Sequence, residues 1–130
     1  MRKILLDTNA YSRLAGGAEE LLDVLGDADV VYFSVFVLGE LLAGFRGGKR
    51  EKQNRQTLRE FLASPTVKLL MATEETAEVF GEVKDALRRQ GTPLPINDVW
   101  IAAHAIEAGA VLVTFDSHFG QVHGLRKWPS

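Results

Sequence analysis

Near its beginning the chain reads Lys3-Ile4-Leu5-Leu6-Asp7-Thr8-Asn9, in which a short, mostly apolar run ends at an acidic side chain. Apolar runs of about four to eight residues are typical of strands that are buried on both faces. Val30 to Phe33, Val67 to Leu70 and Ala110 to Val113 repeat the pattern, and a short edge strand is expected around Leu125. Stretches with helical spacing, not short hairpin turns, separate the runs. The sequence therefore predicts an α/β fold in three layers, with a central parallel sheet flanked by helices.

Three of the separating stretches carry clear helical signals. Over 35–45 apolar side chains recur at i, i+3, i+4 and i+7, which is typical of the buried stripe of a helix and leaves Glu40 off that stripe. Over 73–90 two acids follow a threonine at one end and two arginines close the other, which suits both ends of the helix dipole. The Pro-rich connector that follows predicts a third helix, capped by Asn97 and running to Ala108.

Length and composition are those of one globular domain, which we expect to span residues 1–130. Apolar residues make up 46% and charged residues 25% of the chain, which favours neither a disordered nor a membrane class. The chain has no cysteine, which excludes disulfides and thiolate metal sites and makes a reducing, cytoplasmic compartment the expectation. The apolar run before Asp7 is too short for a signal peptide, and no run approaches the roughly 20 apolar residues of a transmembrane helix.

The net charge of −2 hides an uneven distribution. The segment from Arg46 to Arg59 has six basic residues and one acidic residue, so it carries +5 and leaves −7 for the remaining chain. A cluster of cations of this kind suits contact with a polymer of phosphates. It suits a solvated helix face equally well, and the residues alone leave both interpretations open.

Four acids come from separate parts of the chain but are expected at one edge of the sheet. Asp7 ends the first strand run and Asp116 follows the last one. Glu40 lies on the helix that leaves the second strand, and Asp98 lies near the start of the helix after the Pro-rich connector. Side chains that follow the carboxyl ends of parallel strands converge on the edge where ligands bind. Taken singly, each acid is also explained as a cap, a first-turn acid or a solvated side chain.

A hard divalent cation is the natural partner of such a cluster. Close carboxylates repel each other by about 1 kcal/mol or more per pair unless a cation compensates. Mg²⁺ prefers oxygen ligands and keeps several waters, so these acids suit it better than they suit zinc. His104, His118 and His123 show no i, i+4 spacing of a zinc-binding helix, and structural or surface roles are expected for all three. A divalent ion that activates water and neutralises phosphoryl charge indicates phosphodiester hydrolysis.

Four segments of the chain closely resemble motifs of the PIN-domain family, and within it those of the VapC-type toxins of type II toxin–antitoxin systems. The resemblance covers essentially the whole chain, in order and in spacing. The segments are Leu5-Leu6-Asp7-Thr8-Asn9, Ser34-Val35-Phe36-Val37-Leu38-Gly39-Glu40-Leu41-Leu42-Ala43-Gly44, Asn97-Asp98-Val99-Trp100-Ile101-Ala102-Ala103 and Leu112-Val113-Thr114-Phe115-Asp116-Ser117-His118-Phe119.

The resemblance implies an endoribonuclease that depends on magnesium, or on manganese, and leaves a 5′-phosphate and a 3′-hydroxyl. By motif, the catalytic and metal-site acids are Asp7, Glu40, Asp98 and Asp116. Of these, Asp7 and Asp98 would bind the metal directly. The side chains that would support the pocket through hydrogen bonds are Thr8, Asn9 and Thr114.

Partners are implied by the same resemblance. They are structured RNA such as tRNA or rRNA, a second copy of the chain in a homodimer, and a cognate VapB-type antitoxin whose C-terminal segment occupies the groove over the acids. No membrane partner is expected. Arg46 and Arg50, just beyond the Glu40 motif, are candidates for contact with RNA or antitoxin, although the family motifs do not fix them.

Other functions compete for the same residues. An aspartyl-nucleophile phosphatase also has an acid after its first strand, but it needs a second acid two residues on, where this chain has Asn9. A phosphoacceptor receiver domain needs an acid pair there and a lysine after its last strand, and the chain has neither. The non-enzymatic alternative is a module that keeps the PIN fold and binds RNA or protein without cutting it.

Overall fold

The structure is a computed structural model that describes residues 2–130. Within that range five parallel strands form one sheet in the order β3-β2-β1-β4-β5. The strands are β1 (Lys3–Leu6), β2 (Val30–Ser34), β3 (Val67–Leu70), β4 (Val111–Val113) and β5 (Lys127–Trp128). The α-helices of the same range are α1 (Thr8–Ala15), α2 (Glu19–Gly26), α3 (Val35–Phe45), α4 (Glu51–Leu62), α5 (Glu74–Gln90) and α6 (Ile96–Ala108). A 3₁₀ helix, η1 (Ser117–Gln121), leads towards the last strand.

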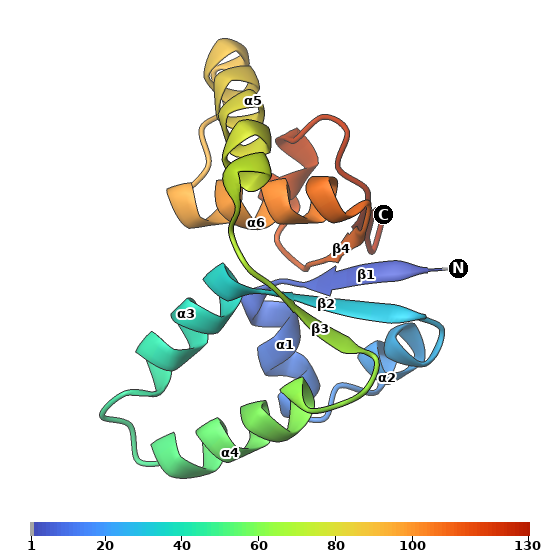
Figure 1. Ribbon diagram of the computed structural model, residues 1–130. Coiled ribbons are helices and arrows are strands. Elements are labelled where there is room, and N and C mark those ends of the chain that lie inside the picture. The colour runs from blue at the N-terminus through green and yellow to red at the C-terminus, as the bar shows by residue number, and fades with distance from the viewer. Residues whose placement is uncertain (1) are drawn as a thin grey trace.

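Helices cover both faces of the sheet (Figure 1). α6 lies over one face and contacts β4, whereas α1, with α2 beside it, lies against the other face and contacts β1. α5 packs on α6 and so lies outside the layer that touches the sheet, and α4 packs against β3 and α3. This arrangement confirms the predicted three-layer α/β fold.

The strands form where the apolar runs predicted them. Ile4, Leu5 and Leu6 expose 1% of their surfaces or less, because β1 lies in the middle of the sheet with a strand on either side. β4 begins at Val111, one residue later than predicted. The edge strand lies at Lys127–Trp128 instead of around Leu125, and it is too short for a period of two to be recognised in the sequence.

Side-chain caps mark the start of two of the three predicted helices. Ser34 caps α3 by accepting the N–H of Phe36 at 3.1 Å, and Thr73 caps α5, so both helices match their predictions. α6 corrects the third prediction, because Pro95 occupies the N-cap position and Asn97 lies inside the helix. A proline is tolerated at a helix start because the N–H that it lacks would have no partner within the helix.

A buried histidine, His104, connects α6 with the end of β2 and with the residue that follows β3. The Nδ1 atom of His104, on α6, lies 2.7 Å from the hydroxyl of Ser34, and its Nε2 lies 3.2 Å from the carbonyl oxygen of Met71. Burial lowers the pKa of His104, so the neutral ring both donates and accepts. The expected structural role is confirmed for this histidine, which fixes α6 against the start of α3 and the end of β3.

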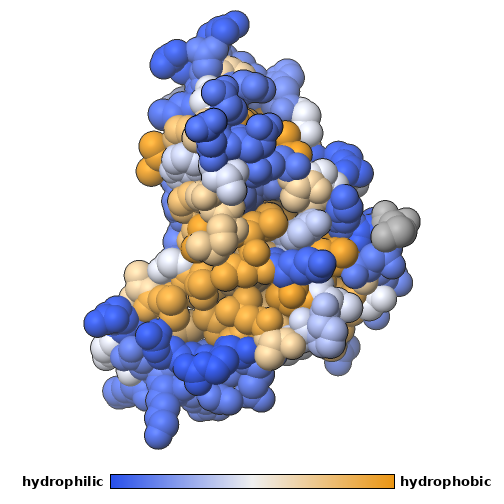
Figure 2. Space-filling model, viewed as in Figure 1, coloured by the Kyte–Doolittle hydropathy of each residue, from blue (hydrophilic) through white to orange (hydrophobic). Residues whose placement is uncertain are grey.

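An apolar area lies over β3 and α3 on the face shown in Figure 2, between the hydrophilic side chains of α4 and α5. Leu69 in β3 and Met71 just after it expose 41% and 61% of their surfaces. Contiguous apolar surface of this kind marks contact with another protein more often than isolated exposed residues do. Separately, no helix within residues 2–130 is long and apolar enough to span a bilayer.

Candidate active site

The four predicted acids meet at the carboxyl edge of the sheet, and we call Asp7, Glu40, Asp98 and Asp116 the acid cluster. Asp7 follows β1 and Asp116 follows β4, and these two strands pair with each other. Glu40 comes from α3 and Asp98 from the first turn of α6. Their charges act on one another, because Glu40, Asp116 and Asp7 all raise the pKa of Asp98. Segments that are distant in sequence therefore form one acidic site.

Asp7 is the buried member of the acid cluster and exposes 5% of its surface. Its Oδ1 accepts the N–H of Ala10 at 2.8 Å, so it also caps α1. Its Oδ2 accepts the hydroxyl of Thr114, and that hydroxyl oxygen accepts the N–H of Asp116 at 3.0 Å. Burial raises the pKa of Asp7, and the two hydrogen bonds offset part of that rise. The capping role is thus real, and it leaves Asp7 within the acid cluster.

The expected supporting residues differ in what they contact. Thr8 donates its hydroxyl to Oε1 of Glu40 at 2.6 Å, which links the start of α1 to α3. Thr114 links Asp7 to the segment after β4. Asn9 is exposed and its side chain has no hydrogen bond within residues 2–130, although it borders an open hollow together with Asp116. Hydrogen-bond support is therefore found for Thr8 and Thr114 and not for Asn9, because α1 turns Asn9 towards solvent.

Asp98 is harder to ionise than an exposed aspartate. Its pKa is raised to about 6, first by burial and then by the charges of Glu40, Asp116 and Asp7, while His118 acts in the opposite direction. The three acidic neighbours each make the ionised form of Asp98 more costly. A cation placed among them would remove that cost, so the electrostatics of the site favour binding of positive charge.

His118 lies beside the acid cluster, whereas the sequence pattern indicated only a structural or surface role. Its backbone N–H lies 2.9 Å and its imidazole Nδ1 lies 2.8 Å from Oδ1 of Asp116. The N–H first and the imidazole second hold the pKa of Asp116 below its usual range. The available signal was the spacing, since His118 follows Asp116 by two residues within the last family motif.

The donor set suits a hard divalent cation that keeps part of its water shell. Within residues 2–130 no group of three or more acidic or histidine side chains is arranged to hold a metal ion. Mg²⁺ needs no such group, since it is usually bound through one or two carboxylates with several waters in place. Each oxygen of Asp7 already accepts one hydrogen bond, and a carboxylate has about four acceptor positions, so lone pairs remain for a cation. The residues therefore fit magnesium or manganese.

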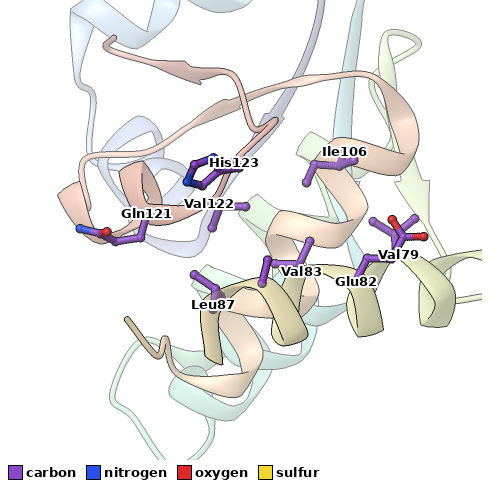
Figure 3. Close-up of a pocket in the computed structure, with 9 residues that line it drawn as sticks. Val79, Glu82, Val83, Leu87, Ile106, Gln121, Val122 and His123 are labelled. Atoms are coloured by element: carbon purple, nitrogen blue, oxygen red, sulfur yellow. The ribbon is translucent and has the colours of Figure 1, made fainter. Parts of the chain in front are cut away.

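A second pocket lies away from the acids, between α5, α6 and the end of η1 (Figure 3). Its volume is about 220 Å³, and Val83 and Leu87 line it opposite Ile106 and Val122. His123 lies at this pocket and not at the acid cluster. An apolar pocket without converging acids offers nothing for phosphate chemistry, so we place the candidate active site at the acid cluster.

The predicted contact arginines lie apart from the acids. Arg46 follows α3 and Arg50 precedes α4, and both are exposed. Arg50 lines a groove with Tyr11 of α1 and Phe45 of α3. Neither arginine is among the charges that shift the pKa of a member of the acid cluster. Their contact with RNA or a partner protein stays a prediction.

Comparison with known proteins now identifies the class. Residues 4–125 match the family described as PIN domain. Over 115 residues the chain is 30% identical to Ribonuclease VapC1 of Haemophilus influenzae (strain R2866), which covers 85% of this chain and 84% of that protein. The chain therefore belongs to the PIN-domain family, and within it is similar to proteins named as VapC ribonucleases.

Solved structures agree with this assignment. The fold matches the crystal structure of VapBC2 from Rickettsia felis bound to a DNA fragment with a TM-score of 0.84 and 26% identity, over 96% of each chain. It matches the crystal structure of DNA-bound VapBC from Salmonella typhimurium with a TM-score of 0.87 and 26% identity, over 98% of this chain and 97% of that one. Both are structures of VapBC, and the likeness in each case extends over nearly the whole chain.

We expect Thr114→Val to lower the free energy of unfolding by about 1–3 kcal/mol. The substitution keeps the shape of the side chain but removes the donor to Asp7 and the acceptor for the N–H of Asp116. Chemical denaturation measures the change. Thr66→Val, at an exposed position, is the matched control and should stay within about 0.5 kcal/mol of the parent. Equal, small losses in both variants would show that the Thr114 hydroxyl does not stabilise the fold.

We expect Asp98→Asn to stabilise the metal-free protein at neutral and higher pH. The folded-state pKa of about 6 exceeds that of an exposed carboxyl, so the folded protein binds this proton more tightly. Ionisation of Asp98 therefore costs stability as the pH rises from about 4 to about 6. In chelator, the variant should melt a few degrees above the parent at about pH 8, and this gain should disappear near pH 4.

The control for this effect is Asp23→Asn, which neutralises an exposed acid on α2 and should leave the melting temperature unchanged. Melting of Asp98→Asn at or below the parent temperature at about pH 8 would contradict the repulsion described for the acid cluster.

Proposed function

We propose that this chain is a VapC-type endoribonuclease, the toxin of a toxin–antitoxin pair, that hydrolyses phosphodiester bonds in RNA with a divalent cation. The observation that carries the proposal is the acid cluster, in which carboxylates from four separate segments share one sheet edge. The similarity to Ribonuclease VapC1 over 85% of the chain supports the same activity.

In this proposal Asp7 and Asp98 bind Mg²⁺, with Mn²⁺ as the alternative, and Glu40 and Asp116 complete the acid cluster around it. When bound, such an ion activates water and neutralises charge on the phosphoryl group. The raised pKa of Asp98 supports this assignment, because a nearby cation would relieve the repulsion that raises it. Hydrolysis would leave 5′-phosphate and 3′-hydroxyl ends.

The chain's own residues prepare the site before RNA binds. The N–H of Ala10 and the hydroxyl of Thr114 orient Asp7, and the hydroxyl of Thr8 orients Glu40. Groups that are already oriented need no rearrangement when charge develops at the phosphate, which is the main electrostatic advantage of a preorganised site. The hydrogen bonds around the acids would therefore contribute to the rate of cleavage and not only to folding.

Two protein partners belong to the proposal. The first is a cognate VapB-type antitoxin that blocks the groove over the acids, and it is supported by the likeness to solved VapBC structures. The second is another copy of the chain, and the apolar area with Leu69 and Met71 is the face on which we place that homodimer (Figure 2).

We also propose that residues 1–130 act as one PIN domain in the cytoplasm, on structured RNA such as tRNA or rRNA.

We expect the protein to cut total RNA in magnesium or manganese and to stop when the metal is chelated. Asp7→Asn and Asp98→Asn should each reduce cleavage by at least about a hundredfold, because each removes a charge from the metal site. Gel analysis of the RNA, with 5′-end labelling of the products, measures the reaction. Asp23→Asn is again the control and should cleave normally.

The same experiment separates the enzyme from the non-catalytic PIN module. RNA that is bound but left intact under every metal condition would favour the module and remove the nuclease proposal. Normal cleavage by Asp98→Asn would remove Asp98 from the site and would not bear on the other three acids.

We expect the double substitution Arg46→Ala and Arg50→Ala to weaken RNA binding and to flatten its dependence on salt. Each lost phosphate contact should lower the slope of log affinity against log salt by about one. Titrations of fluorescent structured RNA at several salt concentrations, with the inactive Asp7→Asn background, measure this slope. An unchanged slope would assign both arginines to a solvated surface.

A further inference from the structure

An aromatic ring fixes a cation at the rim of the acid cluster. The Cζ atom of Arg13, in the last turn of α1, lies 4.0 Å from the ring centroid of Phe115. Within residues 2–130 the guanidinium makes no hydrogen bond and no ion pair, so the ring is its only specific contact there. Arg13 is exposed. All of its donors therefore stay available to a ligand.

The ring that holds Arg13 is itself held in place. Phe115 packs edge to face against Trp128, with ring centroids 6.1 Å apart and planes at 79°. Its two chain neighbours are Thr114, which binds Asp7, and Asp116, which belongs to the acid cluster. The segment that completes the acid cluster therefore also sets the position of the guanidinium.

Arg13 and Asp116, one member of the acid cluster, line the same hollow. Asn9, Ser12, Arg13, Phe115 and Asp116 together line an open hollow of about 500 Å³. The hollow thus combines a cation without a protein partner, an aromatic ring and one of the site acids. A ligand that lies over Asp116 would come within reach of the guanidinium.

A phosphodiester chain needs such a cation here. Four carboxylates repel an incoming polyanion, and one divalent ion offsets only two of their charges. Each further nucleotide of an RNA strand adds another negative charge beside the site. A guanidinium is the side chain that best matches a phosphate, because its planar fork donates two parallel hydrogen bonds.

We propose that Arg13 binds the RNA phosphate adjacent to the scissile one, and that Phe115 holds the guanidinium ready for it. The proposal rests on the proposed nuclease function and names how the substrate strand is positioned at that site. A second groove shares Ser12 with the hollow and reaches Arg50. A strand that continues past Arg13 would therefore cross α1 towards the basic segment that begins at Arg46.

The competing explanation is that Arg13 has a structural role only and packs α1 against the segment after β4. Arg13→Met separates the two, because methionine keeps an apolar stem against Phe115 but has no charge and no donors. Arg13→Lys keeps the charge but loses the planar fork. Phe115→Leu keeps an apolar contact and removes the face that orients the guanidinium. Melting temperatures of all variants show whether the fold is intact.

The test combines cleavage and binding. Steady-state cleavage of an RNA species that the parent cuts in magnesium gives KM and kcat, and a short fluorescent single-stranded RNA of mixed sequence gives the salt dependence of binding in the Asp7→Asn background. Arg13→Met should raise KM about tenfold with little change in kcat, and should lower the salt slope by about 0.7. Arg13→Lys and Phe115→Leu should fall between Arg13→Met and the parent. The control is Arg88→Met, which removes the same charge from the far end of α5, where Asp85 keeps a second arginine partner, and it should change neither value.

The outcomes distinguish this proposal from the function on which it rests. Cleavage by the parent with parental KM and salt slope in Arg13→Met would overturn the role of Arg13 and leave the nuclease standing. A lower melting temperature with unchanged KM and salt slope would show that Arg13 only packs α1 against the segment after β4, which also overturns the proposal. A parent that cuts no RNA under any metal condition would overturn the nuclease function, and the placement of Arg13 beside a scissile phosphate with it.

Discussion

The buried hydrogen bond from the Thr114 hydroxyl to Asp7 is the contact on which the site depends most. It joins the ends of β1 and β4, two neighbouring strands whose pairing is set by the sheet. The same carboxylate caps α1 through Ala10. One side chain therefore ties the sheet, a helix start and the acid cluster together, and a shift of either strand would move all three. Buried hydrogen bonds to a charged group are strong and costly to leave unmade, which makes this junction rigid.

The segment after β4 shows how few residues can organise such a site. Thr114 orients Asp7, Phe115 holds the Arg13 guanidinium, and Asp116 contacts both Thr114 and His118. The chain bends at Phe115, and the ring and its two neighbouring side chains make separate contacts around the site. One stretch of backbone therefore fixes Asp116 and the Arg13 guanidinium relative to Asp7.

Two members of the acid cluster, Asp7 and Asp98, work against the stability of the fold when they are ionised. Burial and like charges raise the pKa of Asp98, and burial raises that of Asp7, so the ionised site is unfavourable without a cation. Structural needs alone would favour neutral side chains at these positions. Perturbed acids that gather at the ligand-binding edge of a parallel sheet are the expected signature of a site built for function. Tight core packing of β1 and the His104 contacts offset this penalty elsewhere in the chain.

The sequence by itself determined the α/β fold, four strands, three helices (α3, α5 and α6) and which four acids come together at one sheet edge, because apolar periodicity and motif spacing are local properties. It gave no bounds for α1, α2 and α4. It misplaced the cap of α6 and the edge strand at Lys127–Trp128, where a proline and a two-residue pairing leave weak local signals. Only the tertiary structure decided that Asn9 faces solvent, that His118 contacts Asp116 and that Arg13 lies over Phe115. The directions of Asn9 and Arg13 depend on how distant segments pack, which no pattern along the chain encodes. The contact of His118 with Asp116 is local, and a spacing of two residues alone does not reveal it.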